Sequence, residues 1–193
     1  MIGIFLGSFN PPHIGHLNAI QSVLESNYGN ELDYIHIIPC RQNPNKVESI
    51  PYWIRYRMCT WMFKGLSNKV LIDDLEADHE FKYTYDMLEY LSSGSDKFIG
   101  KGFKWIITSE TVEEIVNNKW YESSKILNEF GERMIVLSDG KTSKYEDLKY
   151  IDLNPGIDVH STDIRKLVKE NKSIDLFVNQ EVIDIIKNEN LYK

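Results

Sequence analysis

The sequence is poor in the features that would suit it to secretion or to a membrane. It contains only two cysteines, Cys40 and Cys59, in 193 residues, which are too few for a disulfide scaffold. No apolar run in it approaches the roughly 18 residues of a membrane-spanning helix. Its first residues have the pattern of a core strand and not that of a signal peptide. We therefore expect a cytoplasmic protein with no membrane partner.

Positive charge is also scarce. Lysine and arginine together number 22, against 29 aspartates and glutamates, which gives a formal net charge of −7. A surface of this sign repels the phosphate backbone of nucleic acids, so the sequence predicts no nucleic-acid partner. The G-x-G-x-x-G dinucleotide motif is absent as well. Any phosphate must therefore be bound locally, by a few basic side chains and backbone N–H groups.

Short apolar runs alternate with segments of helical periodicity along the chain. We expect strands at residues 1–6, 33–39, 69–72, 103–107 and 133–137. We expect helices at residues 15–25, 51–63, 84–91, 161–169 and 180–188. Alternation of this kind is typical of βαβ units. It predicts an α/β fold: a Rossmann-like doubly wound parallel sheet with helices on both faces, binding ligands at the carboxyl ends of its strands.

The length of the chain suits a single domain over residues 1–193. Within it, we expect residues from about 155 to 193 to form a C-terminal helical subdomain, because the last two helical segments follow one another without a strand.

Two histidines follow the first strand in the segment GSFNPPHIGH, residues 7–16. A strand, a glycine, a tight turn and a helix start create an anion site, because a helix N-terminus exposes unpaired N–H groups. His13 and His16 are three residues apart, so both rings can face one side of the helix start and donate hydrogen bonds to phosphate. On its own, the H-x-x-H pair also fits a packed pair in the core or chance, whereas a metal site is disfavoured because nearby cysteine, aspartate or glutamate ligands are missing.

A second candidate phosphate site lies near the C-terminus, in the segment VHSTDIR, residues 159–165. Ser161 and Thr162 stand at the start of an expected helix, where hydroxyl and N–H groups can hold a phosphate. Arg165 follows one turn later, and its planar guanidinium matches phosphate oxygens. On its own, this segment also fits a capped helix with a solvated arginine.

Both segments resemble motifs of one protein family. GSFNPPHIGHL is similar to the H-x-G-H signature of the nucleotidyltransferase superfamily. VHSTDIR is similar to the I-S-S-T-x-I-R motif of nicotinate and nicotinamide mononucleotide adenylyltransferases, with His160 in place of the usual first serine. Lys46, the segment KYTYD at residues 82–86, the segment WIITSET at residues 105–111, and Trp120 match further family segments in the same order.

The resemblance implies a role for each matching residue. The implied catalytic residues are His16, His13 and Arg165. The implied ATP- and phosphate-binding residues are Gly7, Ser8, Phe9, Gly15, Lys46, Ser109, Glu110, Ser161 and Thr162. The implied residues for the pyridine mononucleotide are Asn10, Thr84, Tyr85 and Trp120. No protein side chain is implied as a metal ligand, since the phosphates of ATP would hold Mg²⁺.

The implied reaction joins a pyridine mononucleotide to ATP and releases pyrophosphate. The attacking phosphate is already ionised near pH 7, so catalysis requires positioning and charge stabilisation and no general base. The KYTYD segment and the Leu191-Tyr192 ending resemble those of the nicotinate-preferring bacterial type, which implies nicotinate mononucleotide as the substrate. The sequence leaves open nicotinamide mononucleotide as the substrate, a non-catalytic nucleotide-binding module of the same fold, and assembly into a homo-oligomer.

Overall fold

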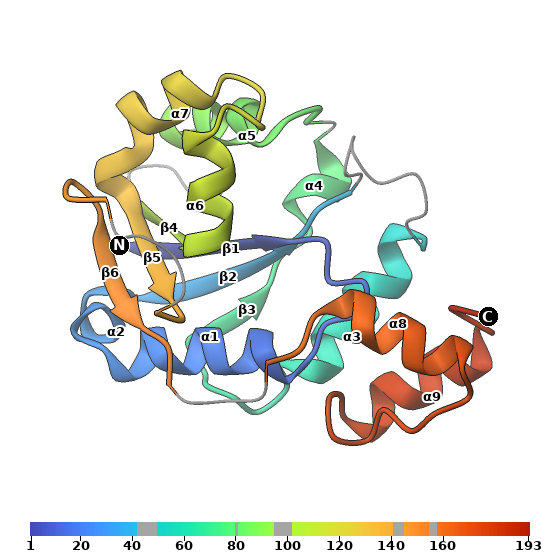
Figure 1. The fold of residues 1–193 in the computed structure, drawn as a ribbon. Helices are drawn as coiled ribbons and strands as arrows, with labels where there is room; N and C mark the ends of the chain where they lie inside the picture. Colours follow the sequence, from blue (N-terminus) through green and yellow to red (C-terminus); the bar gives the residue numbers. More distant parts are fainter. Residues whose placement is uncertain (42–49, 80, 95–101, 141–144, 155–157) are drawn as a thin grey trace.

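The computed structural model describes residues 1–41, 50–79, 81–94, 102–140, 145–154 and 158–193 (Figure 1). Within these ranges six strands form one sheet, in the order β3-β2-β1-β4-β5-β6. All five strand pairs are parallel. The strands are β1 (Ile2–Gly7), β2 (Tyr34–Pro39), β3 (Val70–Ile72), β4 (Phe103–Thr108), β5 (Met134–Ser138) and β6 (Lys149–Asp152).

The centre of the sheet is β1, which pairs with β2 on one side and with β4 on the other. The chain adds strands outward from β1 to β3, then returns to β4 and adds strands in the other direction. A doubly wound sheet has its switch point where this direction changes, and ligands bind at the carboxyl ends of the strands there. In this protein that point lies beyond Gly7 of β1 and Thr108 of β4.

Helices cover both faces of the sheet. Figure 1 shows α1 and α2 on one side and α5, α6 and α7 on the other, while α3, α8 and α9 gather beyond the carboxyl end of β1. The helices are α1 (Ile14–Glu25), α2 (Asn27–Glu31), α3 (Tyr52–Met62), α4 (Leu75–Asp78), α5 (Thr84–Ser92), α6 (Ser109–Val116), α7 (Ser123–Phe130), α8 (Ser161–Lys169) and α9 (Gln180–Asn188). None of these helices is long and apolar enough to cross a membrane, as far as the described residues go.

Neighbouring residues of each central strand belong to two different apolar clusters. Phe5 belongs to the cluster that contains Ile20 of α1 and Met58 of α3. Ile4 belongs instead to the cluster that contains Leu88 of α5 and Val112 of α6. Successive side chains of a strand point to opposite faces, so a strand covered on both sides is apolar at every position. This explains the continuous apolar runs in the sequence.

The expected α/β fold is confirmed, and every expected strand and helix is present with its ends within one residue of the prediction. We did not expect α2, α4, α6, α7 or β6 from the sequence. A usable signal existed for α6, because Thr108 is a good N-cap residue and its hydroxyl accepts the N–H of Thr111 at 3.3 Å. A separate C-terminal helical part stays a prediction, since Ile164 and Ile183 share one apolar cluster with residues of α1 and α3.

Candidate active site

The candidate site starts where α1 begins, at a pair of hydrogen bonds between two histidines and the backbone. His13 is the N-cap residue, and its Nδ1 accepts the N–H of Gly15 at 3.2 Å. His16, three residues later, accepts the N–H of His13 through its own Nδ1 at 3.1 Å. This is a reciprocal capping box built from two imidazoles, and it satisfies two of the N–H groups that a helix start leaves unpaired.

These hydrogen bonds decide which nitrogen of each ring carries the proton. An Nδ1 that accepts a hydrogen bond holds no proton, so Nε2 is the protonated nitrogen of the neutral ring. Burial, with a smaller contribution from the nearby His160, lowers the pKa of His13 to about 4. Burial also lowers the pKa of His16 well below its usual range, with His13 adding to the effect. Both rings are therefore neutral near pH 7 and present an Nε2–H donor.

The neutral state of the two imidazoles limits the ligands that they can bind. The centroids of the two rings lie 3.8 Å apart, so the rings form one unit at the helix start. A ring whose Nε2 carries a proton has no lone pair there for a metal ion, and its Nδ1 already accepts a backbone N–H. The hydrogen bonding of His13 and His16 therefore fits donation to an anion better than coordination of a metal ion.

Phe9 packs against the histidine pair. Its ring is 1% exposed and its centroid lies 4.9 Å from that of His16, edge to face. The ring also covers Gly7, where an added Cβ would lie 2.8 Å from Phe9 Cζ. The backbone of Phe9 has a φ of 45°, a left-handed conformation that costs a bulky residue free energy and persists only where the surroundings hold it.

Gly15, another predicted phosphate-binding residue, lies against the ring of His13. A Cβ added at Gly15 would be 3.0 Å from two atoms of that ring. Since a side chain at this position would push His13 out of its hydrogen bond, glycine keeps the cap in place as well as leaving the helix start open.

The second motif lies directly against the first. Ser161, at the start of α8, donates its hydroxyl hydrogen bond to the Pro11 carbonyl at 2.9 Å. Arg165 donates from Nη1 to the Asn10 carbonyl at 2.9 Å, and from Nη2 to the Thr162 hydroxyl at 3.2 Å. The structure thus brings the two predicted phosphate-binding segments together, although they lie at opposite ends of the sequence.

The first residues of α6 share this edge of the sheet. Ser109 and Glu110 follow the carboxyl end of β4, which pairs with β1. Ser109 is buried, whereas Glu110 is exposed. Their predicted contact with ATP is consistent with this position at the switch point and stays a prediction.

The residues predicted to bind the pyridine ring lie further away. Thr84 opens α5, but the Tyr85 side chain is buried, and its hydroxyl donates to Glu89 at 3.0 Å and to Glu129 at 3.3 Å. Only the backbone of Tyr85 is therefore suited to a ligand. Trp120 is half-buried and donates from Nε1 to Glu114 at 2.9 Å.

The pyridine-binding roles of these residues stay predictions. Among the described residues, no hydrogen bond or ring contact joins Thr84, Tyr85 or Trp120 to the histidine pair. Lys46, predicted to bind phosphate, lies outside the described residues.

Two residues that the sequence did not assign to the site are built into it. Tyr192 donates its hydroxyl hydrogen bond to Asn10 Oδ1 at 2.7 Å, which fixes the orientation of that amide. Arg55 is only 1% exposed and donates to the Ser8 carbonyl at 2.8 Å. A signal for Arg55 was available, since it is one of only five arginines and directly follows the apolar residues Trp53 and Ile54 in a helix.

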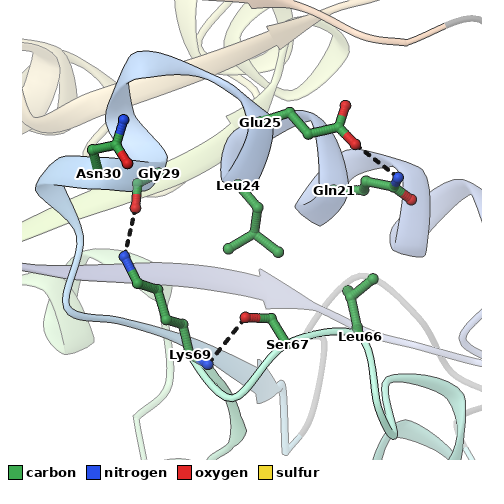
Figure 2. Close-up of a pocket in the computed structure, with 8 residues that line it drawn as sticks. All are labelled: Gln21, Leu24, Glu25, Gly29, Asn30, Leu66, Ser67 and Lys69. Atoms are coloured by element: carbon green, nitrogen blue, oxygen red, sulfur yellow. Dashed lines mark hydrogen bonds between the residues drawn. The ribbon is translucent and has the colours of Figure 1, made fainter.

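A pocket of about 470 Å³ lies elsewhere, between the end of α1, α2 and the segment before β3. Figure 2 shows Lys69 on its rim, reaching to α2. Its ammonium group donates to the carbonyls of Gly29 at 2.7 Å and Leu32 at 2.9 Å, so the cation is used within the fold. The pocket lies near the amino ends of β2 and β3, whereas the two motifs lie beyond the carboxyl end of β1.

Comparison with known proteins agrees with this geometry. A protein-family model described as cytidylyltransferase-like matches residues 4–167. The chain belongs to this cytidylyltransferase-like family. The match contains all of the first motif and all of the second, and it ends just before the last residues of α8.

Relatives of this family member share its full length. A probable nicotinate-nucleotide adenylyltransferase from Caldicellulosiruptor bescii is 33% identical, over 100% of this chain and 98% of the relative. Another from Cytophaga hutchinsonii is 31% identical, over 99% of this chain and 97% of the relative. The expected membership in the nicotinate and nicotinamide mononucleotide adenylyltransferase group is thereby confirmed.

Solved structures agree on the fold. The Plasmodium falciparum nicotinic acid mononucleotide adenylyltransferase complexed with NaAD superimposes with a TM-score of 0.78, over 99% of this chain and 96% of that one. The identity is 23%, so this similarity supports the architecture alone. A putative nicotinate-nucleotide adenylyltransferase from Vibrio parahaemolyticus gives a TM-score of 0.68 at the same identity.

The neutral state of His13 makes the free energy of unfolding depend on pH. As the pH falls from 7 to 4, the unfolded chain takes up a proton at His13 first, because the folded-state pKa is the lower one. The folded protein should therefore lose about 3 kcal/mol of stability over this range through His13 alone. His13→Asn should remove this loss, since asparagine keeps an N-cap oxygen for the Gly15 N–H but does not titrate.

Urea unfolding of wild type and His13→Asn at several pH values between 7 and 4 measures the effect. Parallel pH profiles for the two proteins would contradict the assignment of His13 as a buried neutral ring.

Proposed function

We propose that this protein is an adenylyltransferase that joins nicotinate mononucleotide and ATP to form deamido-NAD and pyrophosphate. The proposal rests mainly on the pair of neutral Nε2–H donors at the start of α1. Ser161 and Arg165 of the second motif hydrogen-bond to the loop that precedes these donors. The names of the curated relatives that span the whole chain supply the substrate class.

In the proposed reaction, a phosphate oxygen of the mononucleotide attacks the α-phosphorus of ATP. A new phosphorus–oxygen bond forms as the bond between the α-phosphorus and the bridging oxygen of pyrophosphate breaks, and the leaving group takes the electron pair. The attacking phosphate is an anion near pH 7, so no side chain has to remove a proton. The protein contributes position and donors aimed at developing charge.

The two histidines would act as donors and not as acids. A neutral imidazole holds its Nε2 proton strongly, so it stabilises a phosphate oxygen by hydrogen bonding without transferring the proton. We assign His16 to the α-phosphate and His13 to the neighbouring phosphates, with Arg165, Ser161 and Thr162 on the β- and γ-phosphates. Mg²⁺ bound to the phosphates of ATP would neutralise part of the charge that collects on pyrophosphate.

The start of α5 supports a substrate with a carboxylate on its pyridine ring. Backbone N–H groups and the positive end of the helix dipole at Thr84 and Tyr85 favour an anion. Tyr83, the N-cap residue, gives its own N–H to Asp86 at 3.1 Å, so it is not part of this donor set. An amide in place of the carboxylate would need an acceptor as well as donors.

A direct assay separates the two possible substrates and the non-catalytic alternative. Pyrophosphate release is measured with ATP and Mg²⁺ in the presence of nicotinate mononucleotide or nicotinamide mononucleotide. We expect turnover with both and a higher kcat/KM for the nicotinate form. A higher value for the nicotinamide form would reverse the substrate assignment, and no release with either would favour a nucleotide-binding module.

Replacing His16 tests the catalytic assignment. His16→Ala removes a donor that the transition state needs, so kcat should fall by roughly 10²–10³ while KM for ATP changes little. Thermal unfolding, measured in parallel, shows whether the variant is destabilised because the His13 N–H has lost its acceptor. Lys166 on α8 is exposed, and the control variant Lys166→Ala should retain wild-type turnover. Wild-type kcat in His16→Ala would refute the role of His16.

A further inference from the structure

The guanidinium of Arg55 holds together the chain segments on which the first motif is built. It donates from Nε to the Ile50 carbonyl at 3.1 Å, from Nη1 to the Ser8 carbonyl at 2.8 Å and from Nη2 to the Arg41 carbonyl at 2.9 Å. Ser8 follows β1, Arg41 follows β2, and Ile50 precedes α3. One side chain thus links the carboxyl ends of two adjacent strands to the helix that carries it.

Burying the guanidinium of Arg55 costs desolvation free energy. Its side chain is 1% exposed, and a buried charge is tolerated only where hydrogen bonds and opposite charge compensate for lost water. Burial lowers the pKa of the Arg55 guanidinium, while surrounding groups, including Glu76, act in the opposite direction. Glu76 also accepts the N–H of Arg41 at 2.6 Å. The backbone of Arg41 is thus held at both its carbonyl, by Arg55, and its N–H, by Glu76.

The contact with Ser8 has a consequence for the next residue. The peptide between Ser8 and Phe9 is planar, and in a trans peptide the carbonyl and the following N–H point in opposite directions. Since the Ser8 carbonyl points to Arg55 on α3, the Phe9 N–H points away from α3. In the described part of the chain, no hydrogen bond uses the Phe9 N–H.

The backbone of Phe9 is also held in a conformation that it would not adopt unaided. Its φ of 45° is left-handed, and backbone strain of this kind persists where several contacts fix it. The ring is fixed by Gly7 below it and by Phe63, whose centroid is 6.1 Å away. The preceding peptide is fixed by Arg55.

We propose that Arg55 is a positioning residue that sets the Ser8–Phe9 peptide, so that the Phe9 N–H is aimed as a fixed donor at a nucleotide phosphate. The identity of that nucleotide rests on the proposed function, but the orientation of the peptide does not. Arg55 itself does not contact the substrate. It acts through three carbonyls, and only a planar fork of donors can reach all three.

Two substitutions at Arg55 separate charge from geometry. Arg55→Lys keeps the charge and loses the fork, whereas Arg55→Met loses both. Misplacing a site group by about 1 Å costs up to roughly 10²-fold in rate, so we expect kcat/KM to fall about 10- to 100-fold in Arg55→Lys and further in Arg55→Met. The matched controls are Arg57→Lys and Arg57→Met, two residues along α3.

Arg57 suits this purpose because it lies at the surface. Its side chain is 56% exposed and contacts Glu189 at 3.1 Å. Exposed ion pairs contribute little to stability, so both Arg57 variants should stay within about twofold of wild-type kcat/KM.

A second measurement follows the Phe9 amide itself. In the wild-type ¹⁵N–¹H spectrum, addition of ATP with Mg²⁺ should shift the Phe9 amide signal more than the amide signals of the central strands. In Arg55→Lys the Phe9 signal should already be displaced without ligand, and its shift on adding ATP should be smaller. The wild-type part of this experiment needs no variant to fold.

The outcomes distinguish this proposal from the proposed function. An ATP-dependent shift of Phe9 without pyrophosphate release would leave the positioning role standing and remove the catalytic one. Wild-type kcat/KM in folded Arg55→Lys, or a Phe9 amide that does not respond to ATP in the wild type, would overturn the positioning role. A loss of stability in Arg55→Lys with unchanged kcat/KM would show that Arg55 is structural only.

Discussion

Two hydrogen bonds at the start of α1 set the chemical state of the site. The Gly15 and His13 N–H groups are donated to the Nδ1 atoms of His13 and His16, and this leaves each ring with its proton on Nε2. The same bonds cap the helix, so the pose of the rings cannot change without opening its first turn. Burial then keeps both rings neutral. A structural requirement of the helix and a chemical requirement of phosphate binding are met by the same atoms.

The rest of the structure holds that first turn in place from the opposite end of the chain. Ser161 and Arg165 bind the carbonyls of Pro11 and Asn10, and Tyr192 binds the Asn10 side chain. From the other side, the buried Arg55 binds the Ser8 carbonyl. Each partner in the loop is a backbone carbonyl or an amide oxygen, so these contacts fix the path of the loop and leave its N–H groups directed elsewhere.

The sequence was sufficient for five of the six strands, the longer helices and the histidine pair, because each leaves a local pattern. Apolar runs mark strands covered on both faces, and the spacing of His13 and His16 follows from the helix turn. The sequence could not identify the partners of Arg55 or Tyr192, since these are oxygens brought near only by the fold. The sequence could not show that the Tyr85 side chain is buried in the apolar cluster of α5 and α7, which leaves only the Tyr85 backbone for the predicted pyridine contact.

The central claim is that His13 and His16 are neutral imidazoles with the proton on Nε2. The ¹⁵N chemical shifts of their ring nitrogens, followed by NMR between pH 8 and 5, test it most directly. The structure predicts a protonated Nε2 and an unprotonated Nδ1 in both rings, with no titration of His13 until the pH approaches about 4. Protons on Nδ1, or a titration midpoint near the ordinary histidine value of 6.5, would contradict it.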